Sequence, residues 1–225
     1  MSTHSTHSTH THTQTDQPSA PSTPSTTLRD VIGLDSRPPR LGESALIMID
    51  FQNTYRSGVM ALDGAETALA AGARLLRRAR AEGTPVVHIL NDGGENTPYD
   101  IRAHIGAISD EVAPMDGEAV VVKQFPNSFH ATELEKTLTD LGFAAGSGRD
   151  LVLAGFMTHM CVNYTTQGAF NLGYRPTVVA EATATRSLTA PDGTVLPAAA
   201  LQSAALTSII DLFGIVVPTV DELPA

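Results

Sequence analysis

The sequence predicts an α/β fold: one three-layer α/β/α domain built on a six-stranded, mostly parallel sheet. Short, continuously apolar runs alternate with longer segments of helical periodicity, as expected of strands buried on both faces and the helices that cover them. Aromatic residues make up only 5% of the 225 residues and Trp is absent, so the 42% apolar content is mostly Ala, Val, Leu and Ile. This composition suits helices packed on a strand-rich centre, and the length suits one domain of about 200 residues.

The first segment, residues 1–27, consists mainly of Ser, Thr, His and Pro and contains no Leu, Ile, Val or Phe. Such a segment cannot bury enough apolar surface to offset its ordering entropy, so we predict a disordered, low-complexity tail. Its histidines could collect a transition metal loosely, but nothing preorganises them, and we expect no specific ligand. Residues 28–42 are expected to be a linker and residues 43–225 the folded domain.

Six apolar runs in the domain are predicted to be buried strands, and four Ala- or Leu-containing segments between them are predicted to be helices. A glycine follows each of the first three helices and is typical of a helix C-terminus. The predicted strands are residues 45–49, 85–90, 119–123, 151–156, 176–182 and 214–218. The predicted helices are residues 61–82, 131–141, 161–172 and 197–213.

Charge and cysteine content exclude several classes of protein. The formal net charge of −10 offers no basic surface for a phosphate backbone or an anionic membrane, so neither nucleic acid nor membrane is expected as a partner. The chain has one Cys, which excludes an intramolecular disulfide and a multi-thiolate zinc site. No signal peptide or apolar membrane span is apparent, and we expect a soluble, cytoplasmic protein that acts on a small molecule.

Three reactive side chains, Asp50, Lys123 and Cys161, stand at or shortly after the ends of predicted strands, Cys161 after a four-residue turn. In an open parallel sheet, ligands bind beyond the carboxyl ends of the strands, near the point where the strand order reverses. We therefore expect these residues to lie close together and to form the candidate site.

Each of these residues also has a structural interpretation. An Asp after a strand commonly forms a turn, a Lys at a strand end is commonly solvated, and a lone Cys is commonly a small buried apolar residue. However, only two of the 14 basic residues are lysines, which favours a specific use for Lys123. Cys161 lies on the first turn of a predicted helix, where the helix dipole favours a thiolate. Position alone leaves both interpretations open.

Three longer motifs carry a resemblance: DFQNTY at 50–55, KQFPNSFHATELEKTLTDLG at 123–142 and LVLAGFMTHMCVNYTTQGAFNLGY at 151–174. Together they resemble the isochorismatase-like cysteine hydrolase family over residues 43–185, and G-x-x-T-H-x-C-V after a buried strand is a fairly specific signature. The resemblance implies the Rossmann-like isochorismatase fold with a six-stranded parallel sheet. It also implies a homo-oligomer.

The resemblance implies a catalytic triad in which Asp50, Lys123 and Cys161 match the family's aspartate, lysine and cysteine. It implies a cis peptide bond between Phe156 and Met157. It further implies an oxyanion hole made of the backbone N–H groups of Met157 and Cys161. In this scheme a thiolate attacks a carbonyl carbon, and the aspartate moves protons to the leaving nitrogen and from the hydrolytic water. No cofactor is expected.

Departures from related families narrow the activity. Nicotinamidase-like members carry a D-x-H metal signature shortly after the first strand, but residues 56–72 contain no histidine, so we expect no metal. Members that hydrolyse the vinyl ether of isochorismate typically lack the cysteine, so Cys161 favours hydrolysis of a C–N bond. We expect His159 to have a structural or supporting role and His130 to be a helix-start residue.

The leading hypothesis is a cysteine-dependent hydrolase of a small amide, lactam, carbamoyl or ureido compound that acts through a thioester. One alternative is a metal-free vinyl-ether hydrolase of the isochorismatase type, in which Cys161 is incidental. Another is a non-catalytic ligand-binding or redox-sensing protein on the same scaffold. The acidic composition suits a cationic substrate, as in the family's streptothricin hydrolases, although whole-chain charge says little about one pocket.

Overall fold

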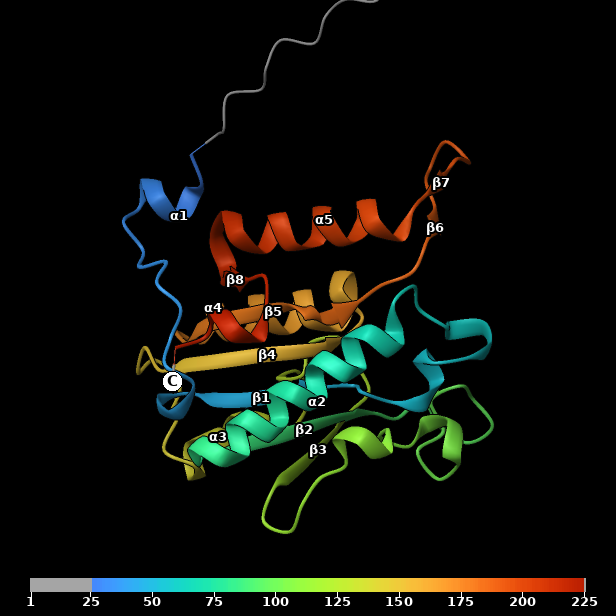
Figure 1. Cartoon of the computed structure of the whole chain (residues 1–225), viewed down its shortest axis with the longest axis horizontal. Helices are drawn as coiled ribbons and strands as arrows, with labels where there is room; N and C mark the ends of the chain where they lie inside the picture. Colours follow the sequence, from blue (N-terminus) through green and yellow to red (C-terminus); the bar gives the residue numbers. More distant parts are fainter. Residues whose placement is uncertain (1–25, 225) are drawn as a thin grey trace, which may run out of the picture.

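The structure is a computed structural model and describes residues 26–224 (Figure 1). Its centre is a six-stranded sheet in the order β3-β2-β1-β4-β5-β8, in which every neighbouring pair is parallel. The sheet consists of β1 (Ala45–Ile49), β2 (Val86–Asn91), β3 (Ala119–Lys123), β4 (Asp150–Phe156), β5 (Arg175–Ala184) and β8 (Ile215–Val217). The main helices are α2 (Ala65–Glu82), α3 (Leu134–Asp140), α4 (Asn163–Asn171) and α5 (Ala198–Ser208).

The sheet is buried between two helical layers, which confirms the predicted three-layer α/β/α fold. All five residues of β1 are buried, and successive side chains point to opposite faces of the sheet. Leu46 and Met48 pack in the cluster that contains the buried face of α2, while Ile47 and Ile49 pack with α3 and α4. Figure 1 shows α2 crossing one face of the sheet. The uninterrupted apolar run in the sequence therefore reflects burial on both faces.

The helix boundaries differ from the predicted ones where local turns intervene. The helix predicted from residue 61 begins at Ala65, because Gly64 adopts a left-handed conformation with a φ of 78°. The helix predicted at 161–172 is preceded by a π-helical turn (Thr158–Val162) that contains Cys161. The sequence prediction also missed a two-stranded hairpin of β6 (Leu188–Thr189) and β7 (Val195–Leu196).

The predicted tail falls almost entirely at residues 1–25, outside the described residues. The predicted linker, residues 28–42, instead contains a short helix, α1 (Leu28–Val31), which begins with a capping box between Thr27 and Asp30. Arg29 is buried and donates hydrogen bonds to the carbonyl oxygens of Leu212 and Asp35, at 3.0 and 2.6 Å. This part of the segment is thus packed against the C-terminal part of the chain.

The strand order defines where a ligand binds. The chain places β2 and β3 on one side of β1, and β4, β5 and β8 on the other, so the order reverses between β1 and β4. Gly155 makes the close approach at this point: a Cβ atom there would lie 1.9 Å from the carbonyl oxygen of Ile49. A side chain at position 155 would push β4 away from β1 and separate the segments that follow them.

Candidate active site

The structure brings Asp50, Lys123 and Cys161 together at the carboxyl edge of the sheet. The Lys123 Nζ atom lies 2.7 Å from Asp50 Oδ2 and 3.3 Å from Cys161 Sγ. The side chains of Asp50 and Lys123 are fully buried, and Cys161 is 6% exposed. Residues from three strand ends, far apart in the sequence, therefore form one cluster, as the sequence analysis expected from their positions.

A fourth residue, Asn91, completes the surroundings of Lys123. Its Oδ1 atom accepts from Lys123 Nζ at 3.3 Å, so the three donors of the ammonium group have three partners: a carboxylate, a sulfur and an amide oxygen. Buried Gln52 holds Asn91 in place, because its Nε2 donates to the Asn91 carbonyl and its Oε1 accepts from the Asn91 N–H, both at 3.0 Å. The sequence analysis missed both residues; their positions, at the end of β2 and two residues after Asp50, were the available signal.

The backbone at Asp50 has an unusual conformation. Its φ angle is 50°, in the left-handed region that non-glycine residues seldom adopt. Its N–H still donates to the Ile89 carbonyl at 3.0 Å, which continues the pairing of β1 with β2 for one residue. Left-handed backbone at a non-glycine residue is concentrated at functional sites, and here it turns the chain directly after a buried strand.

The electrostatics correct the expectation of a thiolate. Burial and the neighbouring Asp50 carboxylate raise the pKa of Cys161 to about 12, although Lys123 opposes the shift. The pKa of Asp50 is also raised by burial, against the opposing charge of Lys123. Burial disfavours the Lys123 ammonium, but Asp50 and Cys161 more than offset this and raise its pKa. The resting site therefore holds a neutral thiol close to the Asp50 carboxylate, with the Lys123 ammonium in contact with both.

The backbone between β4 and Cys161 contains the expected cis peptide bond, between Phe156 and Met157. The Met157 carbonyl accepts from the N–H groups of Met160 and Val162 at 3.0 and 3.2 Å, which starts the π-helical turn. This turn carries Cys161 as its fourth residue. The oxyanion-hole role of the Met157 and Cys161 N–H groups stays a prediction.

Aromatic side chains surround the same edge of the sheet. The ring of Phe156 lies 4.9 Å from that of Phe51 and 5.5 Å from that of Tyr55, and the Tyr55 ring lies 5.8 Å from that of Tyr99. Burial, followed by the charges of Asp50 and Cys161, raises the pKa of Tyr55 well above its usual value. Tyr55 is therefore neutral and extends the apolar surroundings of the triad.

The two histidines singled out in the sequence have different surroundings. His159 Nδ1 lies 2.5 Å from Thr185 Oγ1, which ties the π-helical turn to the residue after β5. His130 stands before α3, with its ring edge-on to Phe125 at 4.8 Å. The helix begins only at Leu134, so His130 lies in the turn that precedes it and is not a helix-start residue.

Residues 26–224 contain no group of three or more His, Cys, Asp and Glu side chains arranged to hold a metal ion. The expectation of a metal-free and cofactor-free reaction stays a prediction. Within the same range, no helix is long and apolar enough to cross a membrane.

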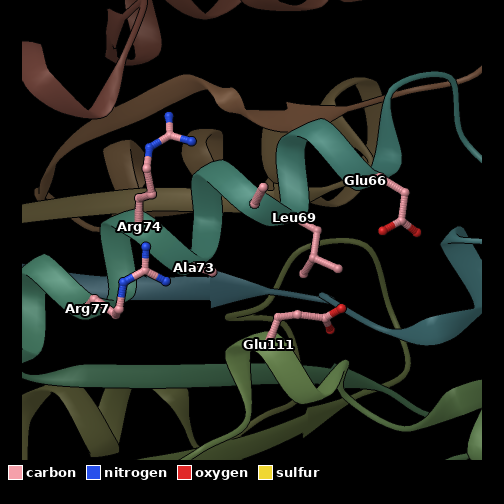
Figure 2. A pocket seen from close by; sticks show the side chains of 7 residues that line it. Glu66, Leu69, Ala73, Arg74, Arg77 and Glu111 are labelled. Atoms are coloured by element: carbon pink, nitrogen blue, oxygen red, sulfur yellow. The ribbon is translucent and has the colours of Figure 1, made fainter.

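A separate pocket of about 480 Å³ lies on the outer side of α2. Figure 2 shows Arg74 and Arg77 toward one end of it and Glu66 and Glu111 toward the other, with Leu69 and Ala73 between them. Arg56 pairs with both glutamates, Glu66 and Glu111, at 2.8 and 3.0 Å. None of Asp50, Lys123 and Cys161 lines this pocket, so it is separate from the candidate active site.

A comparison with known protein families identifies the family of this chain. Residues 44–220 match the isochorismatase domain. The chain therefore belongs to the isochorismatase family, whose members include hydrolases and amidohydrolases.

Three relatives show the range of this family. The chain is 30% identical over 196 residues to a secreted isochorismatase effector of Verticillium dahliae, covering 87% of this chain and 98% of the relative. It is 33% identical to a streptothricin hydrolase of Streptomyces noursei, and the match covers 76% of this chain and 67% of that relative. It is 30% identical to a ureidoacrylate amidohydrolase of Stutzerimonas stutzeri, and the match covers 68% of this chain and 75% of that relative. Because one relative is secreted, the cytoplasmic location expected from the sequence stays a prediction.

A solved structure supports the fold assignment. The crystal structure of an isochorismatase from Pseudomonas putida KT2440 superposes with a TM-score of 0.82 at 37% sequence identity. The match covers 88% of this chain and 98% of the other. The six-stranded parallel sheet and its flanking helices are thus those of the isochorismatase fold.

Proposed function

We propose that the protein is a cysteine-dependent hydrolase that cleaves a C–N bond of a small amide, lactam, carbamoyl or ureido compound. The observation that carries this proposal is the buried contact of Lys123 with both Asp50 and Cys161, at 2.7 and 3.3 Å. A nucleophile, a proton acceptor and a fixed positive charge in one water-poor site are the groups that acyl transfer to sulfur requires. The ureidoacrylate amidohydrolase among the relatives supports chemistry at C–N bonds.

The first step follows from the neutral resting thiol. Asp50 accepts the proton of Cys161 as the sulfur attacks the carbonyl carbon of the substrate, so the thiolate exists only while it is being consumed. Lys123 keeps its proton and stabilises the negative charge as it moves from the carboxylate to the sulfur and then to the substrate oxygen. The backbone N–H groups of Met157 and Cys161 bind that oxygen.

In the second and third steps Asp50 acts first as a proton donor and then as a proton acceptor. The protonated Asp50 donates to the leaving nitrogen, which departs as an amine or as ammonia and leaves a thioester on Cys161. Asp50, again a carboxylate, then accepts a proton from water as the water attacks the thioester carbonyl. The sulfur leaves and recovers a proton from Asp50, which restores the resting site.

The proposal is tested with a screen of amides, lactams, carbamoyl and ureido compounds for release of amine or ammonia. With a substrate in hand, Cys161→Ala should lower kcat/KM by about 10⁴-fold or more, because it removes the nucleophile. Circular dichroism checks that the variant is folded. Undiminished turnover by folded Cys161→Ala protein would refute the cysteine mechanism.

A second candidate is a metal-free hydrolase of an isochorismate-like vinyl ether, with Cys161 incidental. The names of the Verticillium dahliae relative and the Pseudomonas putida structure favour it. The two candidates separate cleanly: hydrolysis of isochorismate that persists in Cys161→Ala supports the second and contradicts the first.

A further inference from the structure

Strand β3 forms one edge of the central sheet, opposite β8 (Figure 1). The Lys123 carbonyl accepts the Asp92 N–H at 2.9 Å, so the backbone groups of Lys123, and of every second residue before it, point toward β2. The N–H and C=O groups of Val120 and Val122 therefore point outward. Among residues 26–224, nothing forms a hydrogen bond with these outward groups.

The two residues with outward backbone groups also expose apolar side chains. Val120 and Val122 are each 46% exposed, whereas Val121 between them is buried in the cluster that contains α3 and α4. The exposed valines thus lie on the sheet face that α2 covers, because successive side chains of a strand alternate between faces. The buried cluster that contains α2 includes no residue of β3. The edge strand is therefore left open in both its backbone and its side chains.

An open edge strand pairs readily with another chain, and proteins usually block it with a proline, a bulge, an outward charge or a covering segment. β3 contains no proline or bulge, and no exposed side chain from residue 119 to residue 126 is charged. Lys123 itself is buried in the triad. At the opposite edge, residues between 27 and 36 line a pocket together with Ile215 and Val216 of β8. Of the two edges, β3 is the one left available for a partner.

A second copy of the chain fits this edge. In an antiparallel pair with a two-fold axis at Val121, Val120 lies opposite Val122 of the partner subunit, and the two residues exchange both N–H···O bonds. β-branched side chains opposite one another on the same face stabilise such a pair. The net charge of −10 opposes association in general, but the uncharged surface of β3 avoids like charges at the contact.

The residues that flank β3 are also self-complementary. The same register brings Phe125 of the partner subunit beside Gly117, which precedes β3. A pocket of about 390 Å³ lies there, and its lining includes Met115, Gly117 and Leu141. Phe125 and Met115 are 48% and 59% exposed. Large exposed apolar side chains on one flank, and a pocket with apolar lining on the other, are features of an interface between identical subunits.

We propose that β3 is the contact surface between two copies of this chain, which join their central sheets edge to edge through antiparallel β3 strands. The sequence resemblance implies a homo-oligomer, and this inference assigns one of its contacts to named residues. Because β3 ends at Lys123, the contact also braces the strand that carries the ammonium group of the triad. The inference does not depend on the proposed reaction.

Size-exclusion chromatography with light scattering tests the proposal over an about 100-fold range of protein concentration. Wild-type protein should have at least twice the chain mass of 23.7 kDa. Val120→Lys combined with Val122→Lys should halve the wild-type mass, because the new charges oppose those of the partner subunit. Val59→Lys is the matched control at a valine that is 80% exposed, and it should leave the mass unchanged. Circular dichroism checks that each variant is folded.

Two further variants test the geometry of the contact. Val122→Pro removes an outward N–H and keeps the bonds between β3 and β2, so it should also halve the mass. In Cys161→Ala protein, Val120→Cys and Val122→Cys chains mixed under oxidising conditions should form a disulfide between subunits. Opposite Cα atoms in such a pair lie about 5.5 Å apart, which a disulfide can span. Val59→Cys mixed with Val120→Cys should not cross-link.

Three results would overturn the proposal. The first is a wild-type mass of one chain at the highest concentration. The second is an unchanged mass in the folded Val120→Lys and Val122→Lys double variant, which would place the contact elsewhere. The third is a monomer whose Val122 amide exchanges hydrogen slowly until residues 1–25 are removed, which would assign the edge to the chain's own N-terminal segment.

Discussion

The triad and the pocket on α2 both contain acidic and basic side chains within salt-bridge distance, yet only the triad has strongly altered chemistry. Beside the α2 pocket, Arg56 pairs with two glutamates that line it, Glu66 and Glu111, whose side chains are 64% and 45% exposed. Figure 2 shows these two glutamates. Asp50 and Lys123 pair at a similar distance with no exposure. Water screens the first set, while the second interacts in a medium of low polarity. The comparison teaches that burial, more than the number of charges, raises the pKa values of Asp50 and Cys161.

The triad and the α2 pocket also differ in how much stability is lost when one partner of an ion pair is removed. An exposed ion pair contributes about 0.2 to 1 kcal/mol, because water and salt screen the attraction and ordering the two side chains costs entropy. Removing one partner of a buried pair leaves an uncompensated charge and commonly costs about 3 to 5 kcal/mol. The following variants use this difference, beginning with the largest expected effect.

Asp50→Asn should lower turnover by roughly 10²-fold or more, because the amide keeps the size of the carboxylate but cannot accept the thiol proton. Steady-state kinetics on a substrate from the screen measures this, with thermal unfolding as the control for folding. A near-normal rate in a folded variant would leave Asp50 as a turn-forming residue only.

The same variant should change thiol labelling in the opposite direction. The Asp50 carboxylate raises the pKa of Cys161, so its removal lowers that pKa and increases the thiolate fraction near pH 7, by about tenfold for each pKa unit. Iodoacetamide should therefore label Asp50→Asn faster than wild type, although turnover is slower. Because the chain has one Cys, the mass of the intact protein reports the reaction directly. Slower labelling in the variant would contradict the neutral resting thiol.

A partly buried acid, Glu118, links pH to stability. Burial would raise the pKa of Glu118, but hydrogen bonds from Arg80, the Met115 N–H and His88 lower it from 4.5 to about 2. A depressed carboxyl pKa stabilises the fold above pH 4.5, and this stability is lost as the pH falls toward 2. Glu118→Gln should lower the free energy of unfolding by about 2 kcal/mol near pH 7.

The difference between Glu118→Gln and wild type should shrink as the pH falls toward 2 and disappear below the folded-state pKa of Glu118, where both side chains are uncharged. Urea unfolding across this range measures it. A difference that is independent of pH would mean that packing, and not charge, accounts for the loss.

The smallest effect is expected in the α2 pocket. Arg74 pairs with Glu181 at 2.8 Å, but its side chain is 48% exposed. Arg74→Gln should change the free energy of unfolding by less than about 1 kcal/mol and leave turnover unchanged. A large loss of turnover would show that this pocket takes part in the reaction and would break the contrast with the triad.

Much of the fold follows from local patterns that the sequence shows directly. The strand runs at 45–49 and 119–123 coincide with β1 and β3. Burial on both faces explains the run in β1. The expectation of a buried strand was wrong for β3, because this strand lies at the edge of the sheet and its Val120 and Val122 side chains are exposed. The hairpin of β6 and β7 was missed because each strand has only two residues and no alternating pattern. The π-helical turn before α4 was missed because it has the apolar pattern of an ordinary helix start.

The residues of the candidate site could be predicted from the sequence, but their burial and pKa values could not. Asp50, Lys123 and Cys161 could be grouped because parallel strands bring their carboxyl ends to one edge. Their burial, and therefore the neutral thiol, depends on packing that no short motif encodes. Asn91 belongs to the site through its contact with Lys123, which only the three-dimensional arrangement shows.

The central claim is that Cys161 forms a covalent intermediate. The most direct measurement is the mass of the protein after rapid acid quenching during turnover of an amide or ureido substrate. The account predicts one added acyl group, located on the peptide that contains Cys161 and absent in Cys161→Ala. Turnover in which the quenched protein keeps its unmodified mass, together with full activity of Cys161→Ala, would contradict it.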